Sequence, residues 1–138
     1  MLEAFMKKQI VILLSIVVLS VISFTSCEPF LVNKIIVRNL AADEVQINLR
    51  AKTYIIPSGE TLVLNDLKKG TFQYNSTYSI PAGVTETETE GEFEGEVVLN
   101  AGTEILFIYR SSLLDNKYKI YIYKTSSDDV NRTDPFEN

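Results

Sequence analysis

The only thiol in this sequence belongs to a single cysteine, so any chemistry that needs two thiols is ruled out within the chain. Cys27 is the only cysteine among the 138 residues, and the chain has no histidine. Structural zinc sites, disulfides and Ser-His-Asp triads all need pairs or sets of these residue types. The composition therefore excludes an intrachain disulfide, a Cys/His zinc site and a histidine-dependent triad. What remains for Cys27 is the chemistry of a lone thiol nucleophile.

The segment before Cys27 has the plan of a secretory signal peptide. Lys7 and Lys8 precede an apolar run over residues 10–22, and small residues follow that run. A basic start, an apolar centre and a small-residue cleavage site are the three parts of such a signal. An uncleaved membrane helix is the alternative, but the apolar run is shorter than the roughly 20 residues that span a bilayer.

The four residues Phe24-Thr25-Ser26-Cys27 resemble a bacterial lipobox, with Phe24 in the place of the usual leucine. The resemblance implies that the Cys27 thiol receives a diacylglycerol thioether, that a peptidase cuts just before it and that the new amine is acylated. It further implies a lipoprotein of the bacterial cell envelope, anchored in the membrane through Cys27 and facing the periplasm or the cell surface. A free buried cysteine is the alternative, but Glu28-Pro29 is a poor core context.

Beyond residue 32 the sequence alternates with a period of two. Val45, Ile47 and Leu49, for example, alternate with polar residues, and Pro/Gly/Asn/Asp turn signals separate the alternating segments. This pattern is typical of strands with one solvated face, so we predict an all-β fold, an antiparallel β-sandwich of about 7–8 strands. The expected strands cover residues 34–38, 44–50, 53–56, 60–64, 72–80, 92–99, 103–110 and 117–124.

The predicted organisation has four parts: a lipoprotein signal peptide over residues 1–26, a lipidated tether over 27–32, the sandwich over 33–125 and a tail over 126–138. The tail has few apolar residues and no alternation, so we expect it to be disordered. The alternative is a tail that docks onto the sheet through Val130 and Phe136.

A Pro/Gly turn and a strand over residues 56–64 precede the sequence Leu67-Lys68-Lys69-Gly70-Thr71-Phe72. The combination resembles a sheet corner of small immunoglobulin-like and transthyretin-like modules. The resemblance implies a fold and carries no binding residues over to this chain.

The run from Thr85 to Glu96 is acidic, with glutamate at every even position. It could be a cation site or a site for a basic partner. However, strand neighbours on one face lie about 6.6 Å apart, whereas calcium needs six or more oxygens at about 2.4 Å. We favour a solvated edge or a protruding hairpin whose charge discourages edge-to-edge pairing.

The net charge of −5 argues against nucleic acid, or an anionic membrane surface, as the main partner. The sequence has no phosphate loop, serine elbow or recognisable carboxylate pair. We therefore expect no enzyme, no catalytic residue, no cofactor and no metal. The hypothesis is a non-catalytic module that binds an envelope or extracellular protein, or a glycan. A structural component of an envelope assembly, with no small ligand, is the alternative. The absence of tryptophan favours a protein partner over a glycan.

The last two expected strands suggest where such a partner would bind. If Tyr109 lies opposite Tyr118, one face of this hairpin is continuously apolar and belongs in the core. The other face then collects four large side chains, which form the candidate partner-binding site: Leu106, Ile108, Tyr121 and Tyr123. Exposed apolar area of this kind often marks an interaction surface. The alternative is that another segment covers it, either around Phe30 and Leu31 or at Phe136.

Overall fold

The computed structural model of the protein describes Met1 and residues 31–129. The chain divides into two compact units, Met1–Phe30 and Leu31–Asn138, and all the strands among the described residues belong to the second. The strands of this unit are β1 (Asn33–Leu40), β2 (Val45–Leu49), β3 (Lys52–Ile56), β4 (Thr61–Leu67), β5 (Gly70–Tyr78), β6 (Glu86–Glu90), β7 (Glu94–Leu99), β8 (Glu104–Leu114) and β9 (Lys117–Ser126).

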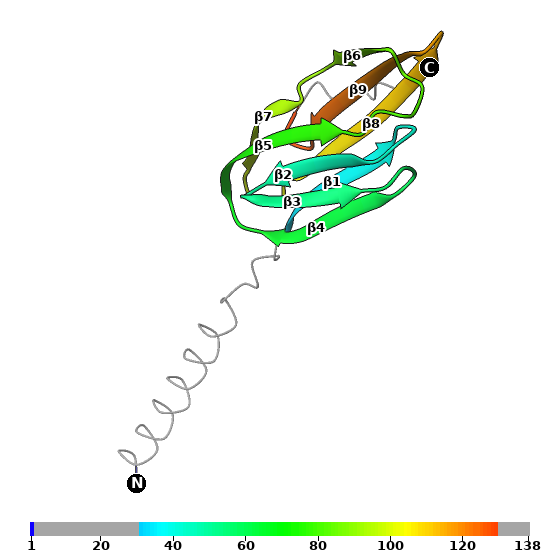
Figure 1. Ribbon diagram of the computed structural model, residues 1–138. Coiled ribbons are helices and arrows are strands. Elements are labelled where there is room, and N and C mark those ends of the chain that lie inside the picture. Colours follow the sequence, from blue (N-terminus) through cyan, green and yellow to red (C-terminus); the bar gives the residue numbers. More distant parts are fainter. Residues whose placement is uncertain (2–30, 130–138) are drawn as a thin grey trace. The chain divides into compact units, whose positions relative to one another are not determined.

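These strands form two sheets packed face to face (Figure 1). The five-stranded sheet has the order β4-β1-β8-β9-β6, and the four-stranded sheet has the order β3-β2-β5-β7. The predicted all-β sandwich is therefore confirmed. Two pairs differ from the expected antiparallel pattern, because β1 pairs with β8 and β6 pairs with β9 in parallel. Both parallel pairs join segments far apart in the sequence, where alternation alone gives no strand direction.

The core lies between the sheets and is built from the inward members of each alternating strand. Val45, Ile47 and Leu49 are buried as the alternation predicts. The Tyr74 and Phe107 rings, from opposite sheets, meet edge to face with centroids 4.9 Å apart. The other fully buried large side chains include Tyr109, Tyr118, Ile35, Leu99, Ile120, Val37 and Val97. The two sheets therefore share one continuous core.

Two buried asparagines on β1 organise the loops at the two ends of the sandwich. Asn39 donates from its side chain to the Asp43 carbonyl at 2.9 Å and to the Ile56 carbonyl at 2.8 Å. At the other end, Asn33 donates to the Leu67 carbonyl at 3.0 Å. We call these the Asn39 end and the Asn33 end. The β1–β2, β3–β4 and β8–β9 turns lie at the Asn39 end, whereas the β2–β3, β4–β5 and β7–β8 turns lie at the Asn33 end (Figure 1).

Candidate functional site

The four side chains proposed as a partner surface lie on the outer face of the five-stranded sheet. Ile108 of β8 pairs directly with Tyr123 of β9, and Leu106 and Tyr121 lie two residues away on the same side. The residues that alternate with them are buried in the core. The structure therefore brings the four together on the face that the alternation predicts.

The predicted register of this hairpin is wrong. Tyr109 pairs with Ile122 rather than with Tyr118, and Tyr118 pairs with Leu113. Both strands are longer than expected, and only Asp115 and Asn116 form the turn between them, with left-handed φ angles of 50° and 60°. Two left-handed residues are the geometry of a tight type I′ hairpin turn. The register error is four residues, an even number, so no side chain changes face.

The neighbouring strands extend this surface with residues that the sequence pattern did not reveal. Ile36 on β1 pairs with Leu106 on one side and with Val63 of β4 on the other. We call the combined surface the apolar face, and it consists of Ile36, Val63, Leu106, Ile108, Tyr121 and Tyr123. Val63 is 46% exposed whereas Ile108 is only 8% exposed. Ile108 therefore forms the floor of the apolar face rather than a contact of its own.

Paired charges border the apolar face on its β6 side. The Lys119 ammonium lies 5.2 Å from the centroid of the Tyr121 ring, and it contacts the Glu88 carboxylate at 3.0 Å and the Glu90 carboxylate at 2.8 Å. Hydrogen bonds from Lys119 and Lys117 lower the pKa of Glu88, and the bonds to Glu90 and Glu88 raise the pKa of Lys119. An apolar centre with a charged rim is the usual anatomy of a protein interface.

Of the segments that might cover this face, only Leu31 is described. It is 58% exposed and lies beside Gly102 at the Asn33 end, where a Cβ on that glycine would be 3.2 Å from the Leu31 Cβ. Phe30, Phe136 and Val130 lie outside the described residues, as do Cys27 and the lipobox. The predicted tail begins with ordered residues, because Ser126 ends β9 and Asp128 accepts from Asn100 and Thr103, both at 2.8 Å.

The acidic run forms an edge strand and then crosses between the sheets. Its first half is β6, which lies beside β9 at the margin of the five-stranded sheet. Its second half enters β7 in the other sheet, so the two halves do not form a hairpin. The crossing needs Gly91, where φ is 100° and a Cβ would lie 2.2 Å from the Ile122 carbonyl oxygen. The interpretation as a charged edge therefore fits this placement.

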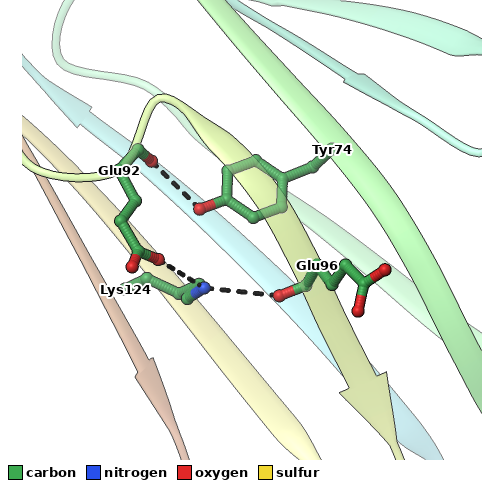
Figure 2. A network of polar contacts seen from close by, with 4 residues as sticks. All are labelled: Tyr74, Glu92, Glu96 and Lys124. Atoms are coloured by element: carbon green, nitrogen blue, oxygen red, sulfur yellow. Dashed lines mark hydrogen bonds and ion pairs between the residues drawn. The ribbon is translucent and has the colours of Figure 1, made fainter.

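A polar network closes the sandwich beside this crossing, as Figure 2 shows. The Lys124 ammonium contacts the Glu92 carboxylate at 2.9 Å and donates to the Glu96 carbonyl at 3.3 Å, while the Tyr74 hydroxyl donates to the Glu92 carbonyl at 3.0 Å. Partial burial alone would lower the pKa of Lys124, but its bond to Glu92 and the nearby Tyr74 raise it. Because Lys124 is on β9 and Tyr74 on β5, the network fastens one sheet to the other.

The centre of the outer face of the four-stranded sheet is polar, whereas Ile55 and Val98 are exposed on its two edge strands. Asn48 of β2 pairs with Asn75 of β5, and Gln46 and Gln73 lie two residues away from them on the same strands and the same side. We call these four residues the amide face. A hollow of about 520 Å³ lies over it, with Glu94 on one side. The part of the chain that the structure describes contains no cluster of three or more His, Cys, Asp or Glu side chains arranged to hold a metal ion.

None of the described residues forms a helix long and apolar enough to span a bilayer. Neither the family models nor the curated proteins give a match to this chain, so its function has to be inferred from its own residues.

Proposed function

We propose that this protein is a lipid-anchored, extracytoplasmic lipoprotein of the bacterial envelope that acts as a non-catalytic binding module for another protein. The observation that carries the binding role is the apolar face. Ile36, Val63 and Leu106 lie side by side on three adjacent strands, and two tyrosine rings continue the surface. A solvent-facing sheet does not need such residues for folding, whereas contiguous exposed apolar area with tyrosine is common at interaction sites.

The anchoring role is supported by the distance along the chain between Cys27 and the fold. The first strand begins at Asn33, six residues after the cysteine. Six residues extend to at most about 20 Å. Acyl chains stabilise membrane attachment by about 0.8 kcal/mol per buried methylene, so several chains on Cys27 would hold the domain firmly. The partner would therefore be met close to the membrane.

A protein partner suits the apolar face better than a glycan does. Sugar hydroxyls need many hydrogen-bonding groups, and these gather on the amide face rather than on the apolar face. Glycan binding would accordingly use the hollow beside Asn48, Asn75 and Glu94. A glycan array distinguishes a glycan partner from a protein partner. A structural role in an envelope assembly would use the apolar face in a fixed complex.

The experiment that tests the binding role is crosslinking in native membranes followed by purification of the full-length protein. The Tyr121→Ser/Tyr123→Ser variant should lose the crosslinked partner while its melting temperature changes by only a few degrees. The matched control is Ile55→Ser/Val98→Ser, because these side chains are 59% and 51% exposed on the other sheet. The control should keep the partner.

Two outcomes would contradict the binding role. One is a partner retained by the tyrosine variant. The other is a large fall in melting temperature for that variant but not for the control, which would show that the two rings serve as core.

A further inference from the structure

The turns at the two ends of the sandwich carry charges of opposite sign, which the net charge of the chain does not show. The turns at the Asn39 end contain acidic residues and no Lys or Arg: Asp43, Glu44, Glu60 and Asp115. The turns at the Asn33 end contain Arg50, Lys68 and Lys69 and no acidic residue. The two sets of turns therefore carry charge of opposite sign, and the basic set lies at the end where the described fold begins. The described acidic residues near that end are Asp66, Glu104, Asp128 and Asp129.

One of the cations at the Asn33 end lies over an aromatic ring. The Arg50 guanidinium lies 5.1 Å from the Phe72 ring centroid. The ring also lies under Gly70, where a Cβ would be 3.4 Å from the Phe72 Cζ. Arg50 of the β2–β3 turn and Gly70 therefore both lie against Phe72, and Lys68-Lys69 of the β4–β5 turn directly precede that glycine.

Lys52 adds a fourth cation at the start of β3, with its ammonium 4.8 Å from the Tyr54 ring centroid. We call Arg50, Lys52, Lys68 and Lys69 the basic corner. All four are exposed, and none forms an ion pair with any residue that the structure describes. The basic corner therefore contrasts with Lys117, Lys119 and Lys124, whose charges are already paired within the fold.

None of the acidic residues that the structure describes near this end forms an ion pair with the basic corner. Asp66 lies within a bulge of β4, two residues before Lys68. Asp128 and the exposed Asp129 follow β9, which β1 and β8 separate from β4 in the sheet, and Asp128 accepts hydrogen bonds from Asn100 and Thr103. Leu31 and Val32, which are 58% and 40% exposed, add apolar surface at the same end.

We infer that the Asn33 end, through its basic corner, is a contact surface for the headgroups of an anionic phospholipid membrane. Unpaired cations beside exposed aliphatic side chains match the polar and apolar layers of a bilayer surface. Each Lys or Arg close to an anionic membrane surface strengthens the binding of the protein to that surface about fivefold. The acidic Asn39 end would be repelled, so the contact would also orient the domain. The inference rests on the proposed anchor at Cys27. Leu31, at the Asn33 end, is only four residues after that cysteine, so an anchored chain would bring this end close to the membrane.

Lysine footprinting of the full, lipidated protein in vesicles tests this inference. An amine-reactive reagent is applied to the protein in phosphatidylcholine vesicles with and without phosphatidylglycerol, and modification of each lysine is read by mass spectrometry. Lys52, Lys68 and Lys69 should react at least threefold more slowly in the anionic vesicles, whereas Lys117 should not change. Raising NaCl from about 0.1 M to 1 M shortens the Debye length from about 10 Å to about 3 Å, so it should remove the protection.

Variants and a phosphate control sharpen the result. Lys68→Gln/Lys69→Gln should lose the protection of Lys52, and the matched Lys117→Gln should keep it. Equal rates in the two lipids, equal protection of Lys117, or the same protection by inorganic phosphate with neutral vesicles would overturn the membrane contact. Acyl labelling of Cys27 is measured on the same sample. Absent labelling would overturn the proposed anchor, whereas labelled protein without protection would overturn only the contact.

Discussion

The apolar face and the amide face lie on the two outer surfaces of one sandwich, and they differ most at the centres of their sheets. Across three adjacent strands, one presents Val63, Ile36 and Leu106. The other presents Asn48 and Asn75 side by side at the centre of its sheet. Both sheets contribute to the same core, so folding makes the same demand on each. The difference supports the proposal that the apolar face binds a protein partner.

The sharpest way to separate folding from binding is to compare neighbours on one strand that point to opposite sides. Phe107 is fully buried, and Leu106 beside it faces outward. Phe107→Ala should lower the free energy of unfolding by about 3–5 kcal/mol. Leu106→Ala should lower the free energy of unfolding by only about 1 kcal/mol, because the Leu106 side chain buries less apolar area than Phe107 does. Urea titration measures both, and equal losses would show that the apolar face is core.

A second comparison sets an inner tyrosine against an outer one. The Tyr109 hydroxyl is buried and shares a hydrogen bond of 2.6 Å with the Ser76 hydroxyl across the two sheets. Tyr109→Phe leaves the Ser76 hydroxyl without its partner and should cost about 1–2 kcal/mol of unfolding free energy. Tyr121→Phe should leave the unfolding free energy nearly unchanged, since its hydroxyl has no hydrogen bond among the described residues. A thermal melt of each variant tests whether Tyr109→Phe is the more destabilised of the two. A larger loss of stability for Tyr121→Phe would contradict the assignment of Tyr109 as the inner residue and Tyr121 as the outer one.

The smallest expected effect concerns two lysine-paired carboxylates: Glu88 in the charged rim of the apolar face, and Glu92 in the polar network beside Tyr74. Hydrogen bonds from lysines lower the pKa of Glu88 and of Glu92 from the ordinary value of 4.5. A lowered pKa in the folded state means that the unfolded chain binds protons first as the pH falls. The stabilisation by these carboxylates is therefore complete above about pH 4.5 and is lost progressively below it. Urea unfolding at pH 7, 4.5 and 3 should show this fall, and Lys119→Met should reduce its size. An unfolding free energy that does not change over this range would contradict the pairing.

The alternation of the sequence was enough to predict the sandwich and the sorting of side chains into inner and outer faces. Val45, Ile47 and Leu49 point inward as expected, and Leu106 and Tyr123 point outward. Face assignment depends only on whether a position is odd or even, so it survived a register error of four residues.

Features that depend on long-range pairing could not be predicted. The parallel pairing of β1 with β8 places Ile36 beside Leu106, and nothing local to either strand indicates it. The basic corner has the same origin, because Arg50 and Lys69 belong to different turns that the fold brings to the same end of the sandwich. Net charge gives no information on how charge is distributed over the turns.

The most direct test of the apolar face as a binding surface is a photocrosslinking comparison of the two outer faces in living cells. A photoreactive amino acid is placed at Val63 on the apolar face or at Ile55 on the face of the other sheet. The two positions are a matched pair, because both lie on edge strands and are 46% and 59% exposed. We predict a discrete crosslinked protein product from position 63 and none from position 55. A product from position 55 alone, or the same product from both, would contradict the assignment of the apolar face as the binding surface.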